Sequence, residues 1–599
     1  MRLLRTLRPF LRPYRGTILL GLSLVVVANA FAAVSPRLLG LAIDAIGRPG
    51  ATLGTAFAYG GLVVLFAIAA GIARYGMRQI LNGVSRRIET DLRDAFFEHL
   101  LRLDAAFYAT HRTGDLMSRA TNDTQAVRMA IGPGVMYLVN TLFSTAFALT
   151  LMLRISPRLT ALALLPLSLL PPVVILFGRT IHRRFARIQD HLGVLSNMVQ
   201  ENLAGARIVR AYTLEATQER EFDALNAEYL AKNMALARTS GLFHPTLTLL
   251  TGLGTVVVVW VGGSGAIRGE ISAGEFVAFS FYLAMLTWPM IALGWVTNLF
   301  ERGMAALGRI DAIMRAEPAV RASAEPVRLD RVHGEIEFRD VSFRYPGSDR
   351  DVLQHVSFRI PAGKTAALVG PTGAGKSTIV ALLTRQYDPT AGEILLDGVP
   401  LTRLDPAQVR AAIGVVPQEP FVFSETIADN IALGLPPGRT LDGRLAEALR
   451  VSRLDEALAV LPNGLETRLG ERGVNLSGGQ RQRLSLARAL VRDPRILVLD
   501  DALSAVDTQT ETEILAGLRR VLEGRTALII SHRVTAVKDA DIILVLDGGR
   551  IVERGRHADL LDRGGVYATL LRRQILTEDL ERDAPLAAAA AGNHSEGHP

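Results

Sequence analysis

The sequence predicts a membrane domain of six long α-helices that extend into the cytoplasm, followed by an α/β domain with a phosphate-binding loop. Three observations support this fold class: six long apolar stretches in the first 300 residues, none of comparable length afterwards, and a Gly-rich loop between an apolar strand and a helix in the second half. The chain contains no cysteine, which excludes disulfide scaffolds, Cys-ligated zinc, iron–sulfur clusters and thiol nucleophiles.

The six apolar stretches predict membrane-spanning helices. Each lacks Asp, Glu, Lys and Arg over 20 to 29 residues, and about 20 residues are enough to cross a bilayer. Six such stretches in 300 residues argue against the alternative of buried helices in a large soluble core. They occupy residues 16–36, 49–73, 129–153, 159–178, 239–267 and 276–300.

The charges of the connectors predict how the chain is oriented. The N-terminal fifteen residues and the two long connectors (74–128 and 179–238) hold 23 Lys and Arg residues, against 5 in the three short connectors. Basic loops stay in the cytoplasm. We therefore expect a multi-pass protein of the cytoplasmic membrane, with its N-terminus, long connectors and C-terminal half in the cytoplasm. This bias also accounts for the net charge of +8 without any nucleic-acid partner.

The long connectors are rich in Arg, Leu, Ala and Glu, which predicts helices that continue out of the membrane. We expect their tips at Phe107–Gly114 and Ala211–Glu219. The predicted divisions of the chain are a membrane domain at 1–310, a linker at 311–330, an α/β domain at 331–575 and a disordered tail at 576–599.

A candidate nucleotide site follows the apolar strand predicted at Thr365–Val369. The spacing G-x4-G-K-S lets backbone N–H groups close on phosphate oxygens, with the next helix pointing its N-terminus at them. Lys376 would supply a mobile cation for the β- and γ-phosphates, and Ser377 a hydroxyl for Mg²⁺. The loop comprises Gly370, Pro371, Thr372, Gly373, Ala374, Gly375, Lys376, Ser377 and Thr378.

Two further motifs accompany this loop. The apolar strand predicted at Ile496–Leu499 ends in Asp500 and Asp501. An acid at a strand end is by itself a turn residue, but beside a phosphate loop Asp500 is expected to hold the Mg²⁺ shell. Between the two strands, two glycines precede an Arg- and Leu-rich helix, which predicts a second anion-binding helix start. That motif is Leu476, Ser477, Gly478, Gly479 and Gln480.

Leu476–Gln480, placed 100 residues after Lys376 and shortly before Asp500, resembles the signature motif of ATP-binding cassette (ABC) transporters. The resemblance covers most of the chain, because six spans and one ATP-binding cassette domain in one polypeptide resemble an exporter half-transporter. It implies ATP and Mg²⁺ as cofactors and an ATPase coupled to transport. It also implies three partners: membrane lipids, a hydrophobic or amphipathic substrate, and a second half-transporter whose signature completes the ATP site.

The resemblance also implies roles for residues that would otherwise be read as structural. Tyr345 resembles the aromatic residue that stacks on adenine, and Gln418 the glutamine that senses Mg²⁺ and faces the membrane domain. His532 resembles the switch histidine at the γ-phosphate. Asp507 lies in a segment similar to the loop that crosses the dimer interface, and Glu471 in one similar to the exporter segment that contacts the helix tips.

One position departs from the family pattern. The residue after the Mg²⁺ aspartate is usually Glu, which activates the attacking water, whereas here it is Asp501. The shorter side chain sets the carboxylate back, and a displacement of about 1 Å can cost about 10²-fold in rate. We therefore expect the chain's own ATP site to be slow, and a heterodimer whose partner carries the usual Glu.

Alternatives to a heterodimeric exporter remain open from the sequence. A homodimer whose Asp501 adapts through a backbone shift or a water molecule is one. A second is an ATP-gated channel or regulator that binds nucleotide without pumping. A third is an importer subunit, although importers usually keep membrane and cassette parts on separate chains.

Overall fold

The computed structural model of the chain describes residues 2–48, 51–436, 438–441, 443–470, 473 and 475–576. The chain divides into two compact units. The membrane unit comprises residues 1–101 and 113–316, and the α/β unit comprises residues 102–112 and 317–599. Beyond Leu576, the expected tail lies outside the described residues.

In the described part of the chain, six helical segments are long and apolar enough to cross a membrane, which confirms the prediction for the first half. These segments are Arg5–Ile46, Leu53–Arg102, Thr113–Ile155, Pro157–Ala204, Glu215–Ile267 and Ala273–Met314. Their elements are α1 (Arg2–Leu11), η1 (Arg12–Tyr14), α2 (Arg15–Ile46), α3 (Leu53–Arg102), α5 (Thr113–Ser118), η2 (Arg119–Asp123), α6 (Thr124–Met129), η3 (Ala130–Gly134), α7 (Val135–Ile155), α8 (Pro157–Leu167), α9 (Leu170–Ala204), α11 (Glu215–Val257), η4 (Val258–Gly262), α12 (Gly263–Ile267) and α13 (Ala273–Met314). The short helix α10 (Ala206–Ala211) lies between the fourth and fifth segments.

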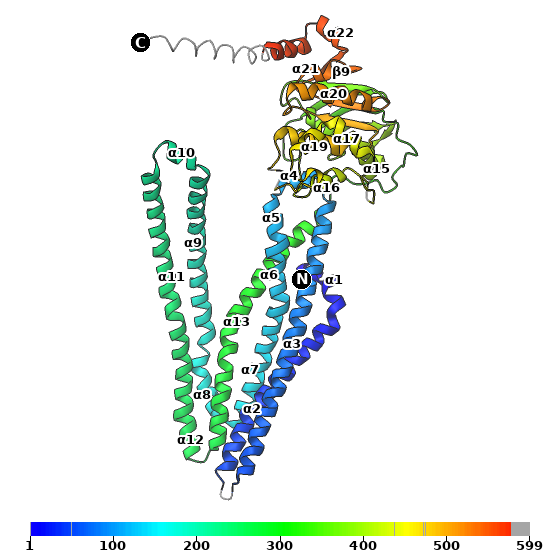
Figure 1. The fold of residues 1–599 in the computed structure, drawn as a ribbon. Coiled ribbons are helices and arrows are strands. Elements are labelled where there is room, and N and C mark those ends of the chain that lie inside the picture. Colours follow the sequence, from blue (N-terminus) through cyan, green and yellow to red (C-terminus); the bar gives the residue numbers. More distant parts are fainter. Residues whose placement is uncertain are drawn as a thin grey trace, which may run out of the picture. The chain divides into compact units, whose positions relative to one another are not determined.

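Helices α3, α9 and α11 continue well beyond their apolar stretches. They contain 50, 35 and 43 residues. At 1.5 Å per residue, 50 residues make a helix of about 75 Å, against about 30 Å for the hydrocarbon core of a bilayer. The long connectors are therefore helical, as their composition predicts (Figure 1).

The second helical tip lies slightly earlier than expected. Helix α9 ends at Ala204 with Gly205 as its C-cap, the short helix α10 follows, and the turn at 212–214 leads into α11. The range Ala211–Glu219 thus contains the turn and the start of α11, while most of the tip precedes it. The physical reason is Gly205, because glycine interrupts a helix more readily than the Leu and Ala around it.

Small side chains and one partly buried ion pair hold α13 against its neighbours in the membrane unit. A Cβ atom at Gly274 would lie 1.9 Å from the carbonyl oxygen of Gly40, so α2 and α13 meet backbone to backbone. Near the other end of α13, Arg309 donates to both oxygens of Asp123, at 2.9 and 2.6 Å. Asp123 is buried in the π-helical turn η2, so this pair fixes α13 against the third span.

The α/β unit contains two sheets. The first sheet has the strand order β2-β1-β4-β5 and is antiparallel. The second has the order β10-β9-β3-β8-β7-β6, in which all neighbours from β9 to β6 are parallel and β10 is antiparallel to β9. The strands are β1 (Ile336–Phe343), β2 (Leu353–Ile360), β3 (Thr365–Val369), β4 (Ala391–Leu396), β5 (Val399–Pro400), β6 (Ile413–Val416), β7 (Ile496–Asp500), β8 (Thr526–Ile530), β9 (Ile542–Asp547) and β10 (Arg550–Gly555).

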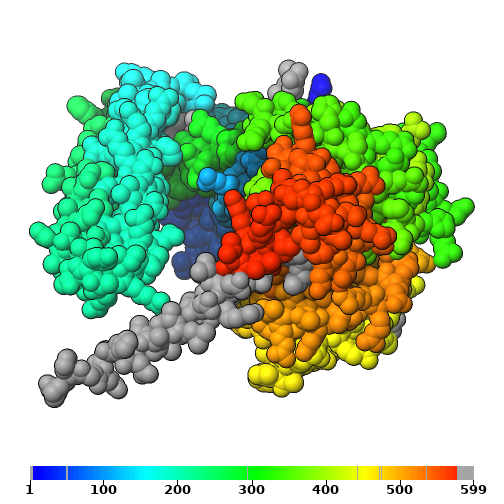
Figure 2. Space-filling model, turned by 90° about the horizontal axis from the view of Figure 1, so that it is seen from above, coloured from blue at the N-terminus to red at the C-terminus, as the bar shows by residue number. Residues whose placement is uncertain are grey.

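Helices pack around these sheets and complete the predicted α/β architecture. They are α4 (Ala105–Thr110), α14 (Lys376–Leu383), η5 (Leu401–Arg403), α15 (Pro406–Ala412), α16 (Ile427–Ala432), α17 (Arg444–Ser452), α18 (Leu454–Val460), η6 (Gly464–Glu466), α19 (Gly478–Val491), α20 (Thr508–Leu522), α21 (Val534–Val537) and α22 (His557–Asp562). Figure 2 shows the segment that contains β1 and β2 (green) and the segment from α17 to α20 (yellow to orange) on different sides of this unit. Because β3, β7 and β8 are neighbouring parallel strands, their carboxyl ends lie at one edge, and the candidate site is built there.

Candidate nucleotide-binding site

The phosphate loop leaves the end of β3 in a conformation that requires glycine. Gly370 has φ 155°, and a Cβ atom there would lie 2.0 Å from the carbonyl oxygen of Leu546. Gly373 and Gly375 have φ 81° and 104°, which L-residues rarely adopt. Helix α14 begins directly afterwards, with Gly375 as its N-cap. The predicted strand, loop and helix are therefore all present.

Lys376 lies folded across its own loop. The residue is 7% exposed. Its ammonium group donates to the carbonyl oxygens of Gly370, at 2.8 Å, and Pro371, at 2.9 Å. Burial lowers the pKa of this amine, while the charges of Asp501 and Asp500 act in the opposite direction. A buried cation whose ligands are two neutral carbonyl groups is well prepared to receive an anion.

Two aspartates stand where β7 ends. Asp500 is buried, and burial raises the pKa of its carboxyl group, which the hydrogen bond from Ser377 partly offsets. Asp501 has φ 48°, a left-handed conformation that is uncommon for a residue with a side chain. Its backbone N–H donates to the carbonyl oxygen of Ile530 at 2.8 Å. This bond couples the turn after β7 to the end of β8.

These groups line one open cleft of about 670 Å³. The cleft brings Gln418 and His532, from separate loops, to the phosphate loop and the two aspartates. Burial lowers the pKa of the His532 imidazole, and the charge of Lys376 lowers it further. The lining residues are Val352, Thr372, Gly373, Gly375, Lys376, Ser377, Thr378, Gln418, Asp500, Asp501, Ile530 and His532. Sequence reasoning did not find Val352 and Ile530, because a single apolar residue carries no motif.

Tyr345 lies beside the loop as part of an aromatic cluster. Its hydroxyl is 3.1 Å from that of Thr378, the third residue of α14. Its ring packs edge-on against Phe343, at 4.9 Å between centroids, and against Tyr387, at 5.3 Å. This arrangement fixes an aromatic face next to the phosphate loop. No motif in the sequence indicated Tyr387.

The signature residues form the start of α19, and the described lining of the cleft includes none of them. Ser477 is the N-cap, and its hydroxyl accepts from the N–H of Gln480 at 3.2 Å. The side-chain amide oxygen of Gln480 in turn accepts from the N–H of Ser477 at 2.8 Å. A Cβ atom at Gly479 would lie 2.8 Å from the carbonyl oxygen of Ala505, so this glycine allows the next loop to pass closely.

Asp507 ends that loop and caps α20, where its side chain accepts from the N–H of Thr510 at 2.9 Å. This hydrogen bond is the main cause that lowers the pKa of the Asp507 carboxyl group. Asp507 therefore has a structural task in addition to the interface role that the resemblance implies. Glu471, expected to contact the helix tips, lies outside the described residues.

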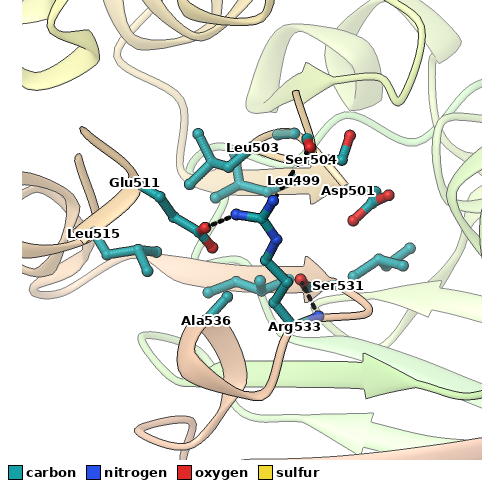
Figure 3. Close-up of a pocket in the computed structure, with 12 residues that line it drawn as sticks. Leu499, Asp501, Leu503, Ser504, Glu511, Leu515, Ser531, Arg533 and Ala536 are labelled. Carbon is teal, nitrogen blue, oxygen red and sulfur yellow. Dashed lines mark hydrogen bonds and ion pairs between the residues drawn. The ribbon is translucent and has the colours of Figure 1, made fainter. Parts of the chain in front are cut away.

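Three residues missed by sequence reasoning hold the loop before α20. Gln482 of α19 donates to the Ser504 hydroxyl at 3.0 Å and accepts from the N–H of Ala505 at 2.9 Å. From the other side, Arg533 donates to the Ser504 carbonyl oxygen at 3.3 Å and pairs with buried Glu511 (Figure 3). The signal for Glu511 was available, since this acid occupies the apolar face of α20.

Comparison with known proteins agrees with this geometry. Residues 18–290 match the family model of the ABC transporter transmembrane region, and residues 353–504 match that of the ABC transporter. A Bacillus subtilis relative, named a probable multidrug resistance ABC transporter ATP-binding/permease protein, is 39% identical over 96% of this chain and 98% of its own length. An ATP-dependent lipid A-core flippase of Aromatoleum aromaticum is 35% identical over 96% and 97%.

Among solved structures, a bacterial Atm1-family ABC exporter with ATP bound superimposes with a TM-score of 0.77 at 28% identity, covering 94% of this chain and 99% of that one. A membrane domain joined to an α/β domain with a phosphate loop and a signature helix defines an ABC transporter, and this chain belongs to that family. More particularly, it is a half-transporter of the exporter type, with an ATPase coupled to transport.

Proposed function

We propose that the chain exports hydrophobic or amphipathic molecules, such as drugs, lipids or peptides, across the cytoplasmic membrane at the expense of ATP. The carrying observation is the cleft that unites Lys376, Asp501 and His532 in a chain that also has six apolar helices. The multidrug and lipid A-core names of the relatives support this cargo class. We also propose that the membrane domain comprises residues 1–310 and that the ATP-binding cassette comprises residues 331–575.

The cleft fits ATP with Mg²⁺. Ser377, Gln418 and Asp500 offer a hydroxyl, an amide and a carboxylate oxygen, which is the donor chemistry that Mg²⁺ prefers. When bound, the ion neutralises charge on the phosphates and positions them. Lys376 binds the phosphates, the ring of Tyr345 stacks on adenine, and His532 contacts the γ-phosphate. Asp501 orients the attacking water.

We further propose that Ser477 and Gly478 act on the nucleotide of a second chain. Their distance from the chain's own cleft supports this, because the described lining of the cleft contains neither. The α9–α11 hairpin supports it as well, since its outer part exposes large apolar side chains. Leu203, Ile208 and Tyr212 are 74%, 61% and 73% exposed. Such a surface suits contact with another subunit.

The partner that we propose is a different half-transporter with Glu at the position of Asp501. In such a heterodimer, ATP hydrolysis is slow at the site that contains Asp501 and fast at the partner's site, which Ser477 completes. The experiment is to purify this chain alone and measure its ATP turnover. We expect slow hydrolysis that rises when the partner is added. Brisk hydrolysis by the chain alone, abolished by Asp501→Asn, would establish the homodimer instead.

The cycle follows from charge. The γ-phosphate of one ATP attracts the start of α14 from one chain and the start of α19 from the other, since helix N-termini carry partial positive charge. This attraction closes the two cassettes. Hydrolysis removes the shared anion and lets them part. Which state dominates depends on how much better ATP binds the closed form.

The export itself is tested in proteoliposomes that hold the full-length dimer. Hoechst 33342, a hydrophobic fluorescent dye, serves as the probe. We expect vanadate-sensitive accumulation of the dye against its gradient when Mg-ATP is supplied on the cassette side. An ATP-gated channel, the second candidate, would only equilibrate the dye. Cassettes and N-terminus in the cytoplasm predict that right-side-out vesicles give no response to added ATP.

A further inference from the structure

The short helix α4 connects two parts of the molecule. It belongs to the α/β unit, yet both ends continue directly into helices of the membrane unit, α3 before it and α5 after it. A displacement of α4 is therefore passed to two membrane helices through covalent bonds alone. What holds α4 in the α/β unit decides how well nucleotide-dependent movements reach the membrane.

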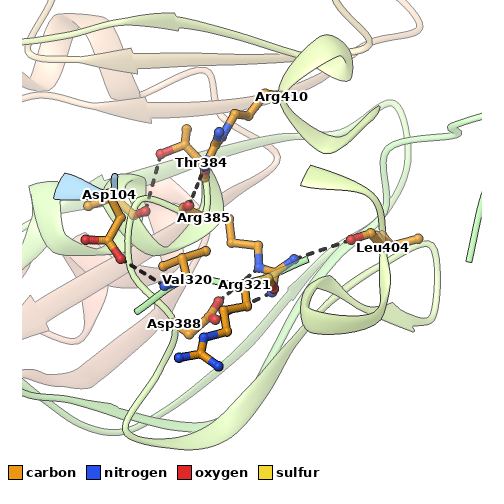
Figure 4. A network of polar contacts seen from close by, with 9 residues as sticks. Asp104, Val320, Arg321, Thr384, Arg385, Asp388, Leu404 and Arg410 are labelled. Atoms are coloured by element: carbon orange, nitrogen blue, oxygen red, sulfur yellow. Dashed lines mark hydrogen bonds and ion pairs between the residues drawn. The ribbon is translucent and has the colours of Figure 1, made fainter. Parts of the chain in front are cut away.

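Asp104, the residue before α4, uses its two carboxylate oxygens for two different partners. Oδ1 accepts from the N–H of Phe107 at 3.2 Å and so caps α4. Oδ2 accepts from the N–H of Val320 at 2.9 Å. Val320 lies in the connecting segment (residues 317–323), which leads from α13 towards β1. A single carboxylate thus joins the helix to the connecting segment (Figure 4).

The backbone of Arg321, the residue after Val320, is held by an arginine that follows the phosphate-loop helix α14. Arg385, two residues beyond the end of α14, is 2% exposed and donates to the carbonyl oxygen of Arg321 at 2.7 Å. It also donates to Asp388 Oδ1 at 3.0 Å and to the Leu404 carbonyl oxygen at 3.3 Å. A buried guanidinium persists when its charge is paired and its donors are used, and both conditions hold here.

A second arginine, Arg410, braces the backbone where α14 ends and Arg385 follows. Arg410 donates to the carbonyl oxygens of Thr384 and Arg385, at 3.3 and 2.9 Å. Because α14 starts at the phosphate loop and ends at Leu383, two residues before Arg385, any rotation of the helix would move Arg385 as well. Hydrogen bonds then run from α14 through Arg321 and Val320 to Asp104 (Figure 4).

We propose that Asp104 and Arg385 are positioning residues that fasten the connecting segment between α4 and the end of the phosphate-loop helix, so that α4 follows α14 when nucleotide binds. Neither residue lines the nucleotide cleft. The inference rests on the proposed function, since it explains how ATP binding reaches the membrane unit. It assigns to residues 317–323 a transmitting task in addition to joining two domains.

Two substitutions remove the same hydrogen bond from opposite sides. Asp104→Ser keeps a good N-cap for α4, but its side chain is too short to serve Val320 as well. Val320→Pro removes the donor and leaves Asp104 intact. The matched control is Arg321→Ala. This neighbouring side chain is 66% exposed and pairs with Glu317, whereas the carbonyl group that Arg385 binds is backbone and is retained.

The readout must separate transmission from ATP binding. Because the chain has no cysteine, spin labels can be placed at Met117→Cys in α5, the helix that follows α4, and at Val460→Cys in the α/β unit, which are 64% and 83% exposed. The distance between labels is measured in the full-length dimer with and without Mg-ATP, after dilution with unlabelled chain. ATP turnover, nucleotide affinity and melting temperature are measured on the same samples.

We expect both variants to keep their ATP affinity and melting temperature. The Mg-ATP-dependent shift in label distance should weaken roughly tenfold in population, the order expected for one hydrogen bond to a charged group. The double variant should be no worse than either single one, since both remove one interaction. Arg321→Ala should behave as wild type.

Three results would overturn the proposal while leaving the proposed function intact: a full distance change in Asp104→Ser, a full change in Val320→Pro, or additive losses in the double variant. A wild-type chain that neither binds ATP nor changes its label distance would instead remove the proposed function itself. A variant with a lowered melting temperature is replaced by Asp104→Asn, whose single carboxamide oxygen serves only one of the two donors.

Discussion

The two helices that face phosphate in the proposed mechanism, α14 and α19, begin in opposite ways. Helix α14 starts after Gly375 in a left-handed conformation, with no hydrogen bond from a capping side chain. Helix α19 starts after Ser477 in an extended conformation, with a complete capping box between Ser477 and Gln480. Both starts follow glycine-rich or small-residue turns, so composition alone does not separate them.

The difference teaches which end depends on its ligand. The first N–H groups of a helix need acceptors. At α19 the side chains of Ser477 and Gln480 accept from two of the N–H groups at the helix start, so this end is partly satisfied before any nucleotide arrives. At α14 no side chain caps the helix, and the Lys376 ammonium is occupied by two loop carbonyl groups. A phosphate would accept from the N–H groups of α14 and pair with the Lys376 ammonium. The ligand therefore completes the start of α14, whereas it only docks against the start of α19.

The largest expected effect tests the α14 end. Lys376→Ala removes the buried cation that receives the phosphates, and loss of one partner of a buried charge pair costs about 2–5 kcal/mol. We expect the affinity of the purified chain for a fluorescent ATP analogue to fall by about 10²–10³-fold. Lys376→Arg is the control, since it keeps the charge. An affinity within a few-fold of wild type would show that α14 does not depend on this cation.

The next effect separates hydrolysis from binding at the same end. Asp501→Glu restores the longer side chain, and a correction of about 1 Å in the position of a reacting group is worth up to about 10²-fold in rate. We expect ATP turnover of the purified chain to rise by that order while its affinity for nucleotide stays constant. Unchanged turnover would mean that the left-handed backbone at Asp501 already places the carboxylate correctly.

Local patterns in the sequence predicted the elements of this site well. The apolar run Thr365–Val369 is strand β3 with those limits, because Lys364 and Gly370 bound it, and the run Ile496–Leu499 is strand β7, which extends by one residue to Asp500. Six spans and helical long connectors followed from charge-free stretches and helix-forming composition. These features depend on neighbours in sequence, which is why a single sequence was sufficient.

Contacts between distant residues could not be predicted in this way. Arg533 and Glu511 are 22 residues apart, and Asp104 and Val320 are 216 apart. No periodicity records such a pairing. Arg385 would be expected at the surface from its charge, and only the fold shows that it is buried beside Asp388. The heterodimer rests on Asp501 alone, so it stays a proposal until its partner is tested.

A smaller effect tests the α19 end. Ser477→Ala removes the capping box, and loss of a Ser cap costs about 1 kcal/mol. We expect turnover at the partner's site to fall roughly fivefold to tenfold in the assembled dimer, with no change in nucleotide binding by this chain's own loop. Ser477→Thr keeps the cap and is the control. Weaker nucleotide binding by the isolated Ser477→Ala chain would place this residue at its own cleft and contradict the comparison.

The smallest effect concerns protons at the α14 end. Burial and Lys376 lower the pKa of His532 below its usual 6.5, so the imidazole is neutral in the nucleotide-free chain at pH 7. The phosphates of ATP favour the protonated form. Binding should therefore take up part of a proton, and affinity should rise by a few-fold as the pH falls from 8 to 6, with at most tenfold per pH unit for one proton.

Calorimetry in buffers of different ionisation enthalpy measures that uptake, and His532→Gln should reduce it, leaving the protonation of ATP itself and of Lys376.

The lowered pKa of His532 has a second consequence, for stability, that can be checked without ATP. Because the neutral imidazole is favoured in the folded chain, the unfolded chain binds the proton first as the pH falls through 6.5, so His532 makes the nucleotide-free chain less stable in acid. His532→Gln should therefore lose less thermal stability than wild type between pH 7.5 and pH 5.5. Equal losses in both proteins, together with an unchanged proton uptake, would place the imidazole outside the phosphate field and leave α14 and Lys376 as the whole of the ligand-dependent end.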